Sequence, residues 1–245
     1  MFPDRNVTGT QHARGGSMSE PVITTTPATA AFDRACVRLR ALQPDYPRVY
    51  APAAMCEQGK RRWWQLRTGL REGRLDLMYR RHAAEMVSDE VAAEVVGTAL
   101  VHAVAGRVTA LFVATGQAWD PGPDNIWIHH DNDGGIDWAG LSDITLRSAG
   151  VHPGMVALPG EHAVAVWLAN RCAASLELVG LHLTRSTGLA PRRFWSLLGE
   201  SVCGAATYVP ALNGMDEALG AHRGQLIMSA LEERGLPVRR GNVNR

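Results

Sequence analysis

The segment PRRFWSLLGESVCGAATYVPALNGMDEALGAHRGQLIMSALEERG, residues 191–235, decides the fold because it holds two helical patterns in succession. The first pattern covers about residues 191–209, and the proline that opens it suits the first turn of a helix. Gly214 separates it from the second pattern, which covers about residues 215–234. The sequence therefore predicts a helical pair in this half of the chain.

Upstream, a further helix is expected over about residues 160–186, and the chain changes character before it. Between residues 119 and 159, turn residues separate short β-like runs. Residues 125–130 (NIWIHH) alternate in polarity, and the Gly-rich turn 131–135 leads into Ile136-Asp-Trp, which is a hairpin signal. We therefore expect a mostly helical α+β fold, with a helical C-terminal half and a small antiparallel hairpin or sheet insertion.

The N-terminal part contains less regular patterns. Residues 1–30 are rich in Gly, Thr, Ser and Pro and predict a disordered tail, which leaves residues 31–245 as a single α+β domain. Helices are expected over about residues 31–42 and 89–106, and the apolar run 108–114 suits either a helix or a buried strand.

A basic segment lies between these helices, over residues 59–86, and its glycines predict two helices or a broken one. The Lys and Arg side chains between Lys60 and Arg81 have two interpretations. They face an anionic ligand or acidic partner, or they form a solvated helical face.

The composition disfavours several classes of protein. The chain has 25 Lys plus Arg against 24 Asp plus Glu, so it carries no general positive field for nucleic acid. It has no uninterrupted run of about 18 apolar residues and no apolar leader, so we expect a cytoplasmic protein without a membrane span. Motifs of nucleotide-binding loops and hydrolase nucleophile elbows are missing from the sequence.

The sequence predicts neither a metal site nor a cofactor. Four cysteines, Cys36, Cys56, Cys172 and Cys203, are widely spaced and are expected to be small buried side chains.

Two groups of residues are candidates for a binding or catalytic site. His129 and His130 lie on the predicted hairpin, where adjacent residues point to opposite faces, so they are poorly placed to hold one ion. Either histidine is a candidate general base, because imidazole titrates near neutrality; surface histidines without a role are the alternative.

The second group consists of basic and aromatic side chains near the start of one helix and near the end of the chain: Arg192, Arg193, Trp195, Arg239 and Arg240. Guanidinium groups bind carboxylate or phosphate with two hydrogen bonds, so this group suits an anion-binding pocket wall. A salt-bridged surface is the other interpretation.

Near its C-terminus the chain reads Gly235-Leu236-Pro237-Val238-Arg239-Arg240, and an earlier helix opens with Phe194-Trp195-Ser196. In these features and in their order, roughly residues 85–245 resemble the FhuF-like ferric-siderophore reductases, whose distant relatives include a domain of the siderophore synthetases. In that family, the final segment leads into a cysteine pair, and two further cysteines complete a two-iron cluster. Here Asn242 and Val243 replace the pair, and neither side chain substitutes for a thiolate ligand.

The resemblance therefore implies a divergent member of the family without an iron–sulfur cluster. The family also tends to carry an asparagine where this chain has Leu197.

The leading functional hypothesis is an enzyme or essential subunit in the biosynthesis of a small polar, siderophore-like metabolite. Its expected ligand is a small polar or anionic molecule, and its expected pocket combines Trp127, His129, His130, Arg192, Arg193, Trp195, Arg239 and Arg240. One alternative is a siderophore-binding protein without catalysis. Another is an obligate partner or homo-oligomeric subunit, since Trp63 and Trp64 lie in the basic segment and are expected to be exposed.

Overall fold

The computed structural model describes residues 26–46, 49–59, 62–130 and 135–239. The elements of this part, in chain order, are α1 (Pro27–Ala41), β1 (Ala53–Ala54), the 3-10 helix η1 (Met55–Glu57), β2 (Trp63–Gln65), α2 (Leu66–Arg71), α3 (Arg74–Glu85), α4 (Asp89–Val101), the π-helix η2 (His102–Gly106), α5 (Arg107–Thr115), β3 (Gln117–Ala118), β4 (Ile126–His130), β5 (Ile136–Leu141), β6 (Leu146–Ala149), β7 (Met155–Leu158), α6 (Glu161–Thr187), α7 (Pro191–Asn213) and α8 (Glu217–Glu233). The expected mostly helical α+β class is confirmed.

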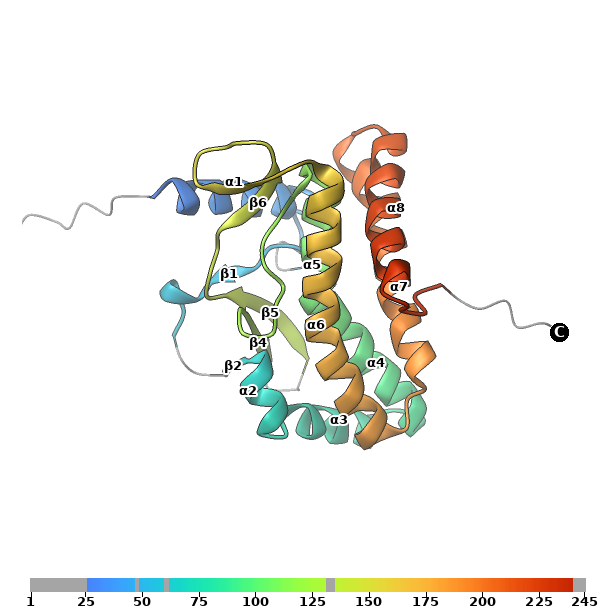
Figure 1. Ribbon diagram of the computed structural model, residues 1–245. Helices are drawn as coiled ribbons and strands as arrows, with labels where there is room; N and C mark the ends of the chain where they lie inside the picture. Colours follow the sequence, from blue (N-terminus) through green and yellow to red (C-terminus); the bar gives the residue numbers. More distant parts are fainter. Residues whose placement is uncertain (1–25, 47–48, 60–61, 131–134, 240–245) are drawn as a thin grey trace, which may run out of the picture.

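The long helix α6 separates the strands from the C-terminal helices. In Figure 1, α7 and α8 lie on one side of α6 and the β-strands lie on the other. The three C-terminal helices begin and end close to their predicted boundaries because local signals define their ends. Gly188 and Gly214 adopt left-handed backbone conformations after α6 and α7, and the Asp216 side chain caps α8 by accepting from the Ala218 N–H.

The helix that begins at Asp89 continues through a π-helical turn to Thr115. Ser88 caps its start, as expected, by accepting from the Val91 N–H. Gly106 does not end it, and the run 108–114 is helical. This run is buried on all sides, so its sequence lacks the polar face that distinguishes a surface helix from a strand.

The strands form two small sheets. The first has the order β1-β5-β4-β2, and within it β4 and β5 pair antiparallel, which confirms the predicted hairpin. The second has the order β3-β6-β7 and contains a parallel pair, β6 and β7, that the sequence did not indicate. Strands this short carry too few residues for a clear periodic signal.

Two expectations for the N-terminal half need correction, and the two helices expected in the basic segment are confirmed. Helix α1 begins at Pro27, so residues 27–30 belong to a helix and not to the expected tail; residues 1–25 lie outside the described residues. The basic segment forms β2, α2 and α3. Its helices are separated at Gly73, whereas Gly69 lies inside α2 and makes a packing contact.

The four cysteines fall into two groups, one buried and one exposed. Cys36 and Cys172 are buried as expected, and burial raises the pKa of the Cys36 thiol to about 12. Cys56 and Cys203 are exposed, so the expectation was wrong for them.

Two helical stretches, Asp89–Thr115 and Glu161–Thr187, have the length and apolar composition of a membrane span. In the most apolar window of each, 78% and 56% of the residues lie inside the protein. Core helices of water-soluble proteins meet the same criteria, so length and composition do not distinguish the two cases here.

Candidate functional site

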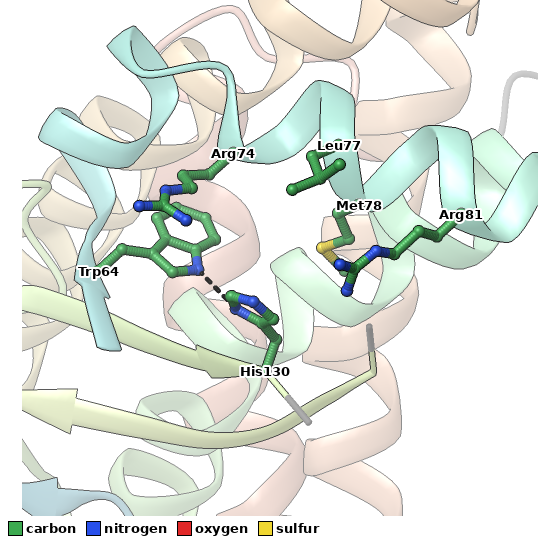
Figure 2. A pocket seen from close by; sticks show the side chains of 6 residues that line it. All are labelled: Trp64, Arg74, Leu77, Met78, Arg81 and His130. Carbon is green, nitrogen blue, oxygen red and sulfur yellow. Dashed lines mark hydrogen bonds between the residues drawn. The ribbon is translucent and has the colours of Figure 1, made fainter. Parts of the chain in front are cut away.

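The hairpin and strand β2 bring two aromatic pairs together. Strand β2 pairs antiparallel with β4, with Trp63 opposite His129 and Trp64 opposite Ile128. Because side chains alternate along a strand, Trp64 and His130 share one face of the sheet. On that face the Trp64 Nε1–H donates to His130 Nδ1 across 3.1 Å, as Figure 2 shows.

The opposite face carries the other pair. The ring centroids of Trp63 and His129 lie 5.0 Å apart. The two histidines therefore lie on opposite faces of the sheet, as the alternation along a strand predicted.

A register shift in the hairpin occurs at the two histidines. His129 pairs with Trp138, whereas His130 pairs with Ile136, so the pairing skips one residue of β5 between them. Such β-bulges bend a strand locally and redirect a side chain, and they are frequent beside functional sites. Here the bulge places His130 at the end of β4 on the face toward α3.

The Trp64 indole has little freedom to move. Its residue is 6% exposed, and it packs against Gly69 in α2. A Cβ atom at position 69 would lie 2.0 Å from the indole Cε3 atom, so only glycine leaves room for the ring. Helix α2 is itself anchored, because Arg67 forms an ion pair with Asp124 in the loop before β4.

Helix α3 completes a small basic hollow around His130. The residues that line it are Trp64, Arg74, Leu77, Met78, Arg81 and His130. In Figure 2, Arg74 lies beside Trp64 and Arg81 lies toward the other end of the hollow. The two arginines are two helical turns apart, so they extend from the same face of α3.

The described residues neutralise the arginine charges in this hollow poorly. Arg74 is 3.5 Å from Glu72, and both side chains are about half exposed, so this pair contributes little. Arg81 forms no ion pair within the described part of the chain. The room inside is about 10 Å³, which is close to one water-sized sphere. Only one small chemical group of a ligand would therefore fit inside, and the rest of the ligand would lie on the exposed rim of the hollow.

The remaining predicted site residues lie elsewhere. Trp127 lies two residues before His129 on β4, and its Nε1–H donates to the Ser142 hydroxyl across 2.7 Å. Arg193 forms ion pairs with Glu94 and Glu200, and its hydrogen bond with Glu94 raises its pKa. The salt-bridge interpretation is therefore confirmed for Arg193. Arg192 is exposed on the first turn of α7.

Trp195 and Arg239 line two further hollows. The Trp195 hollow lies between α6 and α7, encloses about 290 Å³ and contains Glu177, which pairs with Arg234 at 2.8 Å. The hollow at Arg239 lies between α7 and α8 and encloses about 280 Å³. Both volumes are near the lower end for small-ligand pockets.

Arg239 itself forms an ion pair with Glu232. Arg240 lies outside the described residues. The residues expected to share one pocket are thus distributed over separate hollows.

Sequence reasoning did not include Trp64, Arg74 and Arg81 in the site. The basic composition of residues 59–86 was the available signal, but it did not indicate which arginines face the hairpin. Trp64, which was expected to be exposed, is buried against α2, and Trp63 is half-buried.

Comparisons with known proteins give one structural likeness. No family model matches the chain, and no curated protein matches it, so the resemblance to the FhuF-like reductases stays a prediction. Among solved structures, the aerobactin synthetase IucC from a hypervirulent pathotype of Klebsiella pneumoniae is similar, with 18% sequence identity and a TM-score of 0.46. The alignment covers 70% of this chain and 32% of the synthetase, so this chain spans about a third of the length of that protein.

Proposed function

We propose that this chain binds a small anionic metabolite in the hollow between β2, β4 and α3. In this proposal it serves as a cluster-less FhuF-like enzyme, or as an essential subunit, in the biosynthesis of a small polar, siderophore-related metabolite. The observation that carries the binding proposal is the position of His130 in a hollow flanked by Arg74 and Arg81.

The chemistry of these three side chains suits an oxyanion. Guanidinium groups are permanently charged and donate paired hydrogen bonds to carboxylate or phosphate oxygens. Since Arg81 has no carboxylate partner among the described residues and Arg74 has only a weak one, binding an anion disrupts little existing structure. His130, which lines the same hollow, adds a polar ring beside the bound anion.

The metabolic part of the proposal rests on the sequence. Residues 85–245 resemble the FhuF-like family up to Arg240, and the cysteine pair of that family is replaced by Asn242 and Val243. Retention of the surrounding segment without this cysteine pair favours a role in which the ligand site was kept and the redox centre was lost.

A binding screen of the purified chain against carboxylate and phosphate metabolites tests the proposal. We expect the Arg74→Gln/Arg81→Gln double variant to bind any ligand found at least about tenfold more weakly, because both charged contacts are removed. Arg80→Gln is the matched control, since Arg80 lies on α3 but does not line the hollow. Equal binding by the double variant and the wild type would overturn the proposal.

The His130→Gln variant distinguishes an enzyme from a protein that only binds the ligand. The enzyme proposal expects ligand binding within a few-fold of wild type together with loss of pathway output. Unchanged output would instead favour the non-catalytic siderophore-binding protein.

A partner-subunit function is the second candidate. Tyr208 and Leu212 on α7 are 65% and 50% exposed, and Leu219 on α8 is 38% exposed, near the turn that joins these helices. Exposed apolar groups that cluster on a surface are typical of protein interfaces. Aggregation of the isolated chain, relieved by one co-expressed neighbour and by Leu212→Gln, would favour this candidate.

A further inference from the structure

The hydrogen bond between Trp64 and His130 constrains where the imidazole proton lies. An indole N–H only donates, so the nitrogen that receives it needs a lone pair. His130 Nδ1 is that nitrogen, at 3.1 Å from Trp64 Nε1. In the neutral ring, the single proton must then be on Nε2.

We propose that Trp64 is a positioning residue that holds His130 as the Nε2–H tautomer. In the neutral ring, the one acceptor nitrogen then accepts from the indole and the proton is on Nε2. In this state His130 has no lone pair left to serve as the general base that the sequence suggested.

Both the backbone and the side chain of Trp64 are held in place. Trp64 is on a strand that pairs with β4, so its backbone is held relative to that of His130. The side chain is buried, and Gly69 on α2 leaves it just enough room. The donor is thus pre-positioned, in the manner of the outer hydrogen-bond partners that fix the orientation of functional histidines.

This assignment deepens the proposed function by naming the ligand group. Guanidinium side chains have no acceptor atom, so Arg74, Arg81 and neutral His130 are all donors. The two arginines that line the described part of the hollow can only donate, which suits the fully deprotonated oxygens of a carboxylate or phosphate better than an amide, hydroxyl or ammonium group. This selectivity rests on the proposed binding site, whereas the tautomer does not.

Two-bond nitrogen–proton NMR spectra of the ¹⁵N-labelled full chain, recorded at about pH 8 where ordinary histidines are neutral, test the tautomer directly. His130→Gln identifies the His130 signals by their loss. We expect the wild type to show a bare Nδ1 and a protonated Nε2 at His130, and Trp64→Phe to show a mixture of tautomers or the reverse one. Trp63→Phe is the matched control and is expected to leave the His130 pattern unchanged, because Trp63 contacts His129.

A protonated Nδ1 in the wild type, or a His130 pattern that Trp64→Phe leaves unchanged, would overturn the inference. If Trp64→Phe does not fold, incorporating 3-benzothienylalanine at position 64 removes the N–H while it keeps the bicyclic shape, and the same change is expected. No ligand is needed for this test. A negative metabolite screen would therefore refute the proposed function and leave the tautomer assignment unaffected. A failed NMR test would refute the tautomer assignment and leave the binding proposal unaffected.

Discussion

The guanidinium group of Arg223 on α8 lies 2.6 Å from the carboxylate of Glu161 at the start of α6, measured from Nη2 to Oε1. Arg223 also donates its Nη1–H to the carbonyl oxygen of Val113 on α5, across 2.9 Å. Its side chain is 10% exposed. One buried charge therefore joins three helices of the core, and its loss should affect the stability of the whole fold.

We expect Arg223→Met to lower the free energy of unfolding by about 3 kcal/mol, because it leaves the Glu161 carboxylate partly buried without its partner. Urea unfolding followed by circular dichroism measures the change. Arg239→Met is the control, since Arg239 and Glu232 are 60% and 37% exposed, and it should cost less than about 1 kcal/mol. Equal losses in the two variants would contradict this account.

Acid should destabilise the protein through His102. Burial and the nearby charge of Arg107 lower the pKa of His102 in the folded state from its usual 6.5. The unfolded chain therefore binds a proton at a pH where the folded chain does not. Stability is then fully present above about pH 6.5 and is lost as the pH falls from there through the folded-state pKa.

Urea unfolding at intervals from pH 8 to pH 5 tests this expectation. His102→Gln should flatten the decline below pH 6.5, because its amide keeps a donor for the Val49 carbonyl, 2.8 Å from His102 Nε2, without a titrating group. His152 is exposed, so His152→Gln should keep the wild-type slope. A wild-type slope in His102→Gln would assign the acid sensitivity to other groups.

Gly69→Ala should destabilise the protein although alanine favours a helix. Its Cβ would lie 2.0 Å from the Trp64 ring, and such overpacking costs about 1–3 kcal/mol, which outweighs a gain of up to about 1 kcal/mol in helix propensity. Gly204 in α7 is a matched control, because its nearest neighbouring atom would be 3.9 Å away. Thermal unfolding should rank Gly204→Ala at or above the wild type and Gly69→Ala below it; the opposite order would show that Trp64 has room to move.

Arg193→Gln should affect stability but not ligand binding. Arg193 is held by Glu94 and Glu200, and its side chain is 28% exposed, so the substitution removes a partly screened network that contributes about 1 kcal/mol. Arg193 does not line the hollow at His130, so the affinity for an anion bound there should stay within about twofold. A large loss of affinity, measured by calorimetry, would show that Arg193 does contribute to the binding site.

Local signals in the sequence were sufficient for much of the fold. Pro191 opens α7, Gly188 and Gly214 end helices, and Ser88 caps α4, because each of these effects depends on residues within one turn. The hairpin followed from alternation and a Gly-rich turn, and the separation of His129 from His130 followed from the two-residue period of a strand.

The composition of the site depended on contacts between distant residues. Trp64 and His130 are 66 positions apart, and the Arg193–Glu94 pair joins residues 99 positions apart, so neither contact has a local signature. The sequence does not indicate whether an arginine has a carboxylate partner. Arg193 has one, whereas Arg81 has none in the described part of the chain. The order of amino acids by itself determined the helices, their ends and the hairpin. Tertiary packing decided which charged side chains have partners and which can bind a ligand. The physical reason is that Coulomb and hydrogen-bond energies depend on distance and burial and not on sequence separation.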